Sequence, residues 1–367
     1  MKRLVLVGGG HSHIEVLLRF SRDAPPGEIL LVTPEPRQIY SGMLPGHIAG
    51  HYRFDDIQID LATLCARARI PLKLARVTAL DFRGRSIACS NGSRIDFDLL
   101  SLDAGSTPHT GGIRGVPEHV VSLRPLAQFV SAWNEIRDAV VCSRSRQRIA
   151  IIGAGAAGVE LALAMHHAVR NSPVPCEFLL MSDTDRILPD HGARARRCIE
   201  HILRERGITM PMNQRVTGVD RGILHTEKGS SIAADHVIWA TGAAAPAWIM
   251  ESGLARDEGG FMLVDHSLQS ISHAGVFGAG DVASLRDHPR PKAGVYAVRQ
   301  GPPLATNLRH ALLGKRLVAH YPQRTALALI STGNRYAVGE YGSITFHGAW
   351  AWRWKDFIDR RFVSRYR

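Results

Sequence analysis

The sequence has few cysteines, and they lie far apart. Its five cysteines are Cys65, Cys89, Cys142, Cys176 and Cys198. No two of them form a C-x-x-C or other close pair, which is typical of reduced, structural thiols. A disulfide framework and a relay of paired cysteines are therefore not expected. Because no Cys or His residues recur at zinc-binding intervals either, we expect no metal site.

Long apolar runs are also missing. The longest candidate, residues 149–165, is interrupted by a glycine turn and by Glu160, so it does not predict a transmembrane helix. Lys2 and Arg3 precede only four apolar residues, which suits a first strand better than a signal peptide. With 367 residues, 45% of them hydrophobic, the chain is expected to form two or three globular domains in the cytoplasm.

Acidic residues are too few to balance the basic ones. The chain has 45 Lys and Arg against 33 Asp and Glu, a formal net charge of +12. Such an excess is compatible with nucleic acid, an anionic membrane surface or an arginine-rich proteome. Because no zinc-finger spacing, aromatic RNA-binding signature or helix-turn-helix pattern accompanies it, we expect no nucleic-acid partner.

Two glycine turns are the most informative positive feature. GGGHSH begins at Gly8 and GAGAAG at Gly153, and each follows a short apolar run and precedes a helical stretch. In the second turn, Gly153 permits a tight turn, Gly155 lets the backbone approach a pyrophosphate, and Gly158 lets the helix pack on the strand. The helix N-terminus then offers N–H groups to the phosphates. Two such turns predict two bound nucleotides and electron transfer between them.

The first turn departs from this pattern. Gly8 and Gly10 fill two of the three glycine positions, but His13 occupies the third. Either the helix sits differently or the imidazole points away from the strand. His11 and His13 are interpreted as structural or phosphate-contacting residues, since no Ser/His/Asp or Cys/His set accompanies them.

The order of elements repeats along the chain. Around the first turn we expect a helix over 13–21, a strand over 28–32 and a helix over 61–68. Around the second we expect strands over 177–181, 208–210 and 237–242. DLLSLDAGS (98–106) matches HVIWATGAA (236–244), which indicates two copies of one α/β architecture, joined by a Pro/Gly-rich bridge over 107–117.

GAGD, ending at Asp281, follows the second copy, so the first domain is expected to be split around the second. The predicted boundaries are 1–110 and 266–314 for the split domain, 111–265 for the inserted domain, and 315–367 for a small C-terminal α+β region.

The C-terminal segment has a different pattern. Short strands are expected over 326–330 and 336–342, followed by an amphipathic helix. Its apolar face is formed by Trp350, Trp354, Phe357, Ile358 and Phe362, and its basic residues, Arg353, Lys355, Arg360, Arg361 and Arg365, are spread around the other faces. A basic, aromatic helix of this kind either lies in a membrane interface or covers a domain or dimer contact, and the sequence leaves both open.

Four segments carry a family resemblance: VLVGGGHSHIEVL, YSGMLPG, KAGVYAVRQGPPLATNL and WRWKDFIDRRF. The chain resembles the pyridine nucleotide-disulfide oxidoreductase superfamily, within it the type II NADH dehydrogenase branch, and most narrowly the flavoprotein that is fused to or associated with selenide, water dikinase. The resemblance implies two Rossmann-like dinucleotide-binding domains, with FAD in the split domain and NADH or NADPH as co-substrate in the inserted one.

By that resemblance, Gly8 and Gly10 hold the FAD pyrophosphate and Asp281 bonds the ribityl chain or phosphate region. An alternative for Asp281 is that it caps a helix beginning at 282–284. Residues 40–45 and 296–301 flank the flavin ring, and Ala297 opens a helix whose N-terminus faces it. The other implied FAD contacts are His11, His13, Thr33, Glu35, Gly42, Met43, Leu44, Pro45, Val77, Ala104, Gly105, Gly280 and Tyr296. The implied nicotinamide dinucleotide contacts are Gly153, Gly155, Ala156, Gly158, Ser182, Asp183, Thr241 and Gly242.

Two residues are implied as catalytic, Glu160 and Gln300. Glu160 would orient the nicotinamide or the acceptor, and the alternative is a glutamate favoured by the helix dipole. Gln300 is one of a glutamine pair used near the quinone, and Val295 replaces the other, which weakens quinone as acceptor. Ser182 and Arg186 leave the choice between NADH and NADPH open. Sulfide:quinone reductases need a reactive cysteine late in the chain, and none follows Cys198.

The leading hypothesis is an FAD-dependent NAD(P)H dehydrogenase that passes electrons to a quinone-like or other small acceptor. One alternative is a selenium- or sulfur-compound oxidoreductase linked to selenide, water dikinase. Another is a flavin-binding partner protein with a degenerate nicotinamide site, which Ser182 keeps open. The expected location is the cytoplasm, with peripheral contact at the inner face of the membrane through residues 350–367.

Overall fold

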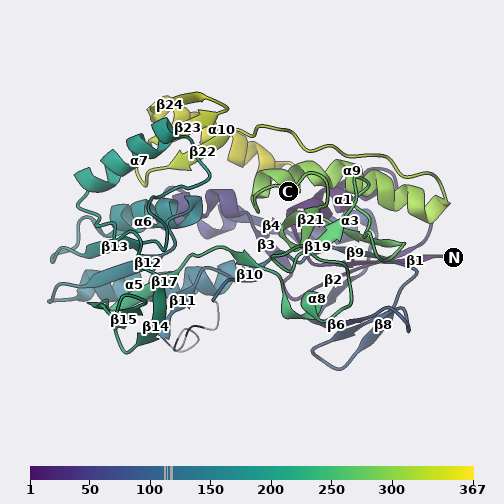
Figure 1. The fold of residues 1–367 in the computed structure, drawn as a ribbon. Coiled ribbons are helices and arrows are strands. Elements are labelled where there is room, and N and C mark those ends of the chain that lie inside the picture. The colour runs from purple at the N-terminus through teal and green to yellow at the C-terminus, as the bar shows by residue number, and fades with distance from the viewer. Residues whose placement is uncertain (111–112, 114, 116–118) are drawn as a thin grey trace.

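The fold is built around two parallel β-sheets that lie side by side (Figure 1). The structure is a computed structural model that describes residues 1–110, 113, 115 and 119–367. Of the predicted bridge over 107–117, residues 111, 112, 114, 116 and 117 lie outside the described residues. Among the described residues, no helix combines the length and hydrophobicity needed to cross a bilayer.

The first sheet has the strand order β20-β9-β1-β2-β5, with every neighbouring pair parallel. Its strands are β1 (Arg3–Val7), β2 (Glu28–Thr33), β5 (Leu72–Leu74), β9 (Leu99–Leu102) and β20 (Val276–Gly278). Helix α1 (His11–Arg22) packs against α3 (Leu61–Ala68) and α9 (Gly294–Leu313). Because β20 follows the second unit in sequence, the chain returns to complete the first sheet.

The second sheet has the order β11-β17-β12-β13, again all parallel. Its strands are β11 (Val121–Ser122), β12 (Arg148–Ile152), β13 (Glu177–Met181) and β17 (His236–Trp239), and the helices packed beside it are α5 (Leu126–Cys142) and α6 (Ala156–Val169). The predicted strand over 208–210 is wrong, since Thr209 forms only an isolated bridge with Leu179.

The internal repeat is present in three dimensions. In the first unit, the antiparallel sheet β6 (Val77–Asp81), β7 (Ser86–Cys89) and β8 (Arg94–Asp96) leads into β9. In the second, the antiparallel sheet β14 (Val216–Asp220), β15 (Ile223–Thr226) and β16 (Ser231–Ala233) leads into β17. β9 pairs with β1 as β17 pairs with β12. The predicted α/β fold class is therefore confirmed.

The C-terminal region is an antiparallel sheet with a helix beside it. It contains β22 (Ala328–Ser331), β23 (Ala337–Tyr341), β24 (Ile344–Gly348) and α10 (Ala349–Ser364), and it contacts α7 (Ala193–Glu205). The remaining short elements are β3 (Arg37–Ile39), η1 (Ser41–Met43), α2 (Leu44–Ile48), η2 (Phe54–Ile57), β4 (Gln58–Asp60), β10 (Thr107–Pro108), β18 (Ala243–Ala244), α8 (Ala247–Met250), β19 (Met262–Val264), η3 (Gly280–Val282) and β21 (Ala283–Leu285).

The apolar face predicted for α10 is correct for four residues and wrong for the fifth. Trp350, Trp354, Phe357 and Ile358 are 36–60% exposed. Phe362 instead turns inward and stacks on Tyr40, with ring centroids 4.5 Å apart. Each i,i+4 step rotates a row of side chains by about 40°, so three steps from Trp350 turn the row by about 120° and reach the inner face.

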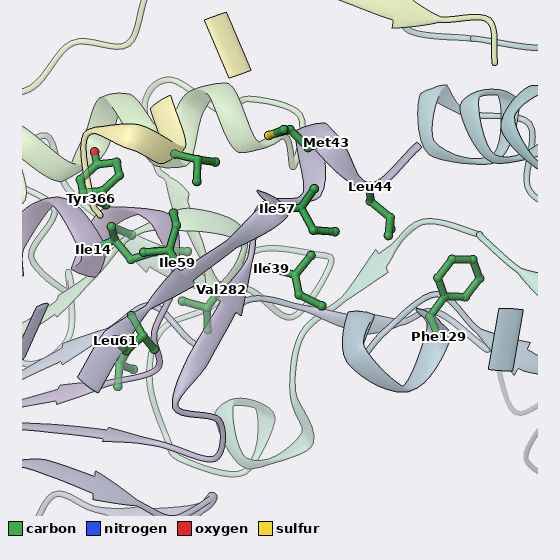
Figure 2. Packing of buried hydrophobic residues seen from close by; sticks show 14 of the residues in the cluster. Ile14, Ile39, Met43, Leu44, Ile57, Ile59, Leu61, Phe129, Val282 and Tyr366 are labelled. Atoms are coloured by element: carbon green, nitrogen blue, oxygen red, sulfur yellow. The ribbon is translucent and has the colours of Figure 1, made fainter. Parts of the chain in front are cut away.

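The C-terminal end of the described chain is anchored to α1. Tyr366 is 1% exposed, and its hydroxyl donates to Glu15 Oε2 at 2.8 Å. Glu15 also accepts hydrogen bonds from Arg19 and Arg365. Figure 2 shows the Tyr366 ring on the same apolar cluster as Ile14 of α1. The end of the chain therefore helps to hold α10 against the first unit.

Replacing this tyrosine is expected to destabilise the protein. Tyr366→Ala removes a buried ring and is expected to lower the free energy of unfolding by about 3 to 5 kcal/mol. Tyr366→Phe keeps the ring and loses only the hydrogen bond to Glu15, at a cost of about 1 kcal/mol. Urea denaturation followed by circular dichroism measures both. Equal losses for the two variants would contradict packing as the main contribution.

Candidate functional site

The first glycine turn lies at the carboxyl end of β1. Gly8 has φ +93°, and a Cβ there would collide with the backbone of Asp103 and Ala104. One of the two predictions for His13 was that its ring points away from the strand, and this prediction is wrong. Its Nδ1 lies 2.7 Å from the Gly8 carbonyl and its Nε2 2.8 Å from Ser101 Oγ on β9. Since a carbonyl only accepts, Nδ1 carries the proton. Burial lowers the pKa of His13 to about 4, so the ring is neutral and structural.

Asp103, directly after β9, is a residue of this turn that the sequence reasoning missed. The carboxylate is 2% exposed and accepts the backbone N–H groups of Ser12 and His13 at 2.8 and 2.9 Å. Burial raises its pKa to about 7. Through its two hydrogen bonds, the Asp103 side chain caps the N-terminus of α1, where the helix dipole favours negative charge. The sequence carried one signal for Asp103. DAGS follows β9 in the first unit, whereas the matching ATGA after β17 in the second unit has no acidic residue.

His11 is the strongest sign of a ligand at this turn. Its Nε2 is buried, and in the described part of the chain it has no hydrogen-bond partner. Its ring lies 5.5 Å from that of Tyr40 and 5.9 Å from that of Phe362. Burial lowers the pKa of His11 to about 4. A buried, unpaired polar atom in a glycine turn at a helix N-terminus is accounted for by a ligand that bonds it.

Several predicted residues meet in one pocket beside this turn. Gly280, Asp281, Tyr296, Ala297 and Gln300 all line it. The chain after Asp281 enters the strand β21, so the alternative of a helix capped by Asp281 is wrong. Gln300 Oε1 accepts the Gly280 N–H at 2.7 Å, which fixes the η3 turn. The helix α9 begins at Gly294. The start predicted from the sequence, Ala297, lies three residues later.

Two basic residues at this pocket were also missed. Arg124 donates to Asp281 Oδ2 at 2.9 Å. Lys292 lines the pocket and donates to the Ala283 carbonyl at 2.6 Å. Burial lowers the pKa of Lys292 to about 8. Both side chains suit an anionic ligand. Lys292 opens the segment KAGVYAVRQGPPLATNL, whereas Arg124 belongs to none of the four segments that carry the resemblance.

The other residues predicted for the first site lie around the same sheet. Thr33 is buried at the end of β2, whereas Glu35 is exposed two residues later. Val77 begins β6, and Ala104 and Gly105 follow β9. Gly42, Met43, Leu44 and Pro45 form the end of η1 and the start of α2, and Figure 2 shows Met43 and Leu44 on the apolar cluster.

The second glycine turn has the three features expected of it. Gly153 has φ +112°, and a Cβ there would collide with Ala240. A Cβ on Gly158 would collide with the Gly153 carbonyl. A Cβ on Gly155, in contrast, would meet no described atom within 4 Å. Gly155 is the N-cap of α6, which begins at Ala156, so open space lies in front of a helix N-terminus.

Thr241 and Gly242 follow β17, next to this turn. Ser182 and Asp183 follow β13 on its other side. The structure therefore brings all of the predicted nicotinamide residues to the carboxyl ends of neighbouring strands, where nucleotides bind in open α/β sheets.

A charge cluster joins α10 to the 40–45 loop. Lys355 Nζ donates to the Gly42 carbonyl at 2.7 Å and to Asp359 Oδ2 at 2.6 Å. Tyr40 donates to Asp359 Oδ1 at 3.1 Å. Lys355 is 12% exposed and Asp359 7%, so Lys355 lies on the inner face of α10 and not on the face of the exposed aromatic residues. The i,i+4 spacing of Lys355 and Asp359 could have predicted this ion pair from the sequence.

Glu160 lies close to this cluster. Its Oε1 accepts the Ser331 N–H at 2.7 Å. Burial raises its pKa to about 7, and the nearby Lys355 opposes that shift. Lys355 is itself buried, yet Asp359 and Glu160 raise its pKa and keep it protonated. Because the first turn of α6 holds no acidic residue, the helix-dipole alternative for Glu160 is wrong.

The cysteines do not form a redox centre among the described residues. All five are free thiols. Burial raises the pKa of Cys65 and of Cys176 to about 12, which suppresses their thiolate forms.

Comparison with known proteins agrees with this arrangement. The family model for Pyridine nucleotide-disulphide oxidoreductase matches residues 2–301. An NADH dehydrogenase-like protein of Mycobacterium tuberculosis is 26% identical, covering 99% of this chain and 94% of its own. The demethylphylloquinone reductase NdbB of Synechocystis is 24% identical, covering 90% and 85% respectively.

Solved structures share the fold. NDH2 of Plasmodium falciparum in complex with NADH superimposes with a TM-score of 0.83 at 13% identity, covering 99% of this chain and 98% of that one. The sulfide:quinone oxidoreductase of Aquifex aeolicus gives 0.84 at 18% identity, covering 100% and 92%. Both therefore share the overall fold of this chain.

Proposed function

Because the chain belongs to the pyridine nucleotide-disulphide oxidoreductase family, we propose that it is an FAD-dependent NAD(P)H dehydrogenase that passes electrons to a quinone-like acceptor. One observation carries the proposal: two glycine turns, at Gly8 and Gly153, each lead into a helix at the carboxyl end of a parallel sheet in one chain. The NADH dehydrogenase-like and quinone reductase relatives support the same activity.

The residues present fit FAD at the first turn. The missing Cβ atoms of Gly8 and Gly10 let the turn lie directly against Asp103, and the N-terminus of α1 begins there. His11 Nε2 is a buried atom that needs a partner. Asp281 and Arg124 offer an acceptor and a cation at the neighbouring pocket. When bound, FAD supplies a two-electron carrier that accepts hydride from a nicotinamide and yields the electrons to a second substrate. The proposed FAD and nicotinamide contacts are those predicted from the sequence, extended by Arg124.

Glu160 is proposed to supply the proton that quinone reduction consumes, and Lys355 to supply a fixed positive charge beside it. NAD(P)H, one proton and a quinone give NAD(P)⁺ and a quinol, so one proton must come from solvent. Glu160, with a pKa of about 7, exchanges a proton near neutral pH. Lys355 holds a positive charge against the Gly42 carbonyl, on the loop expected to flank the flavin. Gln300 is proposed to act indirectly, because it accepts the Gly280 N–H and so holds the η3 turn in place.

Anaerobic flavin reduction tests this function. The purified protein is expected to be yellow, to bleach on addition of NADH or NADPH, and to regain its colour with menadione. A protein that binds FAD but is bleached by neither nicotinamide would overturn the proposal. It would favour the alternative of a flavin-binding partner protein, which the open space at Gly155 argues against.

A selenium or sulfur species as electron partner, and a link to selenide, water dikinase, rest on the sequence motifs alone. Turnover with menadione against turnover with selenite and polysulfide separates the two acceptor classes. We expect menadione to be reduced at least about tenfold faster, because the described residues include no reactive cysteine pair to receive sulfur.

The outer face of α10 is proposed to contact an anionic membrane, from which a lipid-soluble acceptor would enter. Trp350 and Trp354 are 50% and 41% exposed, and Phe346 stacks on Trp350 at 5.0 Å. Arg353 and Arg361 are exposed on the same helix. Aromatic side chains and arginines together suit the headgroup region of a bilayer. This contact would place the protein at the inner face of the membrane.

Vesicle sedimentation tests the membrane contact. The protein is expected to sediment with phosphatidylglycerol vesicles at low salt, less with phosphatidylcholine vesicles, and about tenfold more weakly after Trp350→Ala with Trp354→Ala. Trp352→Phe, at a buried position on the same helix, is the matched control. Dimerisation without vesicle binding would indicate that this face is a contact between two copies.

A further inference from the structure

The turn after β13 has an unusual charge arrangement for a site that binds NADH. In open α/β sheets, an acidic residue at the end of this strand bonds the ribose 2′-OH and repels a 2′-phosphate. Here that position is Ser182. Ser182 Oγ bonds Thr184 Oγ1 at 2.8 Å and accepts the Thr184 N–H at 3.2 Å. Its hydroxyl is therefore used within its own turn.

This turn lies beside the second glycine turn. Gly153 N donates to the Met181 carbonyl at 2.9 Å, and Leu188 N donates to the Ala154 carbonyl at 2.8 Å. These two hydrogen bonds hold both ends of the 182–188 segment beside Gly153 and Ala154, which lead into α6. A ribose attached to a pyrophosphate at Gly155 falls within reach of this segment.

Arginines neutralise each nearby carboxylate. Arg215 Nη2 lies 3.6 Å from Asp183 Oδ2, and Arg186 bonds both oxygens of Asp185 at 2.7 Å. Arg196 of α7 adds a third guanidinium, close enough to lower the pKa of Asp185. Three guanidinium groups against two carboxylates leave this cluster with a net charge of plus one.

Arg196 supplies an independent sign of a missing anion. Its Nη2 donates to the His191 carbonyl at 2.9 Å, but its Nε is buried and has no hydrogen-bond partner within the described ranges. Guanidinium donors are suited to phosphate, which they bind in pairs. A buried guanidinium N–H without a partner is costly unless a ligand bonds it.

We propose that the nucleotide site at Gly155 accepts a ribose 2′-phosphate through Arg186, Arg196 and Arg215, so that NADPH is the preferred nicotinamide. The proposal rests on the proposed function and specifies its electron donor. Ser182 admits the phosphate because it carries no charge. The arginines attract it, and they leave Asp183 and Asp185 without a free negative charge.

Binding of adenosine phosphates tests this without any flavin chemistry. Isothermal titration calorimetry of the FAD-saturated protein compares 2′,5′-ADP with 5′-AMP, which differ only in the 2′-phosphate. We expect 2′,5′-ADP to bind at least about tenfold more tightly, and the difference to shrink at high salt. Equal or tighter binding of 5′-AMP would overturn the proposal. If neither compound binds, the nucleotide site itself fails, and the proposed function with it.

Variants assign the effect to this cluster. Ser182→Glu is expected to weaken binding of 2′,5′-ADP about tenfold or more without weakening that of 5′-AMP, because the new carboxylate repels the 2′-phosphate but can accept a hydrogen bond from a free 2′-OH. Arg186→Ala with Arg215→Ala is expected to abolish the preference. Arg197→Ala, an exposed arginine on α7, is the control and should keep it. Unchanged selectivity in the double variant would contradict the role of these arginines.

Discussion

Gly155→Ala is expected to slow flavin reduction by NADH and NADPH about 100-fold while leaving the fold and the FAD content intact. A Cβ at Gly155 meets no described atom within 4 Å, and its φ of −72° is one that alanine adopts without strain. The added methyl group therefore costs nothing in folding and enters only the space that a pyrophosphate would occupy. Stopped-flow absorbance at 450 nm, with thermal melting as the folding control, measures both quantities.

Gly158→Ala separates steric damage from blocked binding. A Cβ at Gly158 collides with the Gly153 carbonyl, so this variant is expected to lose about 1 to 3 kcal/mol of stability as well as nicotinamide binding. Gly155→Ala should lose only the binding. If Gly155→Ala reduces its flavin at the wild-type rate, the pyrophosphate does not lie at the second turn, and the assignment of this turn would be wrong.

Glu160→Gln is expected to lower the rate of quinone reduction about 100-fold and to leave flavin reduction by NAD(P)H nearly unchanged. The amide keeps the acceptor for the Ser331 N–H but can neither give nor take a proton. Because the pKa of Glu160 is raised to about 7, its proton is lost as the pH rises through that value. Wild-type quinone reduction should therefore fall above pH 7, and the variant should lack this step.

Stability provides the control for this substitution. The folded-state pKa of Glu160 lies above its usual 4.5, so deprotonation destabilises the folded protein progressively from about pH 4.5 to 7. Glu160→Gln removes this effect and should unfold no more easily than the wild type at pH 8. Stopped-flow reoxidation of the reduced protein by menadione, from pH 5.5 to 8.5, measures the catalytic step. A variant that slows both half-reactions equally would indicate a structural role.

Much of the fold could be predicted because its signals are local. Short apolar runs before Gly8 and Gly153 predicted β1 and β12, and the helix over 61–68 agrees with α3. Glycine positions predict backbone conformation directly, as the positive φ angles of Gly8 and Gly153 illustrate. The predicted domain boundaries and the roles of the site residues stay predictions.

Errors arose where long-range contacts outweigh local pattern. The His13 ring bonds Ser101, which is 88 residues away in sequence and is brought near only when β9 pairs with β1. The i,i+4 row on α10 drifted around the helix, so Phe362 reached the inner face and stacked on Tyr40. No local rule places either partner.

By itself, the sequence determined the two glycine turns, because strand, glycine and helix are neighbours along the chain and the backbone geometry they need is local. Only the tertiary structure decided the chemistry around them. It placed Lys355 of α10 on the Gly42 carbonyl and near Glu160, and it gathered Arg186, Arg196 and Arg215 at the end of β13. Burial and mutual charge set the protonation of such groups, and both depend on neighbours that are distant in sequence.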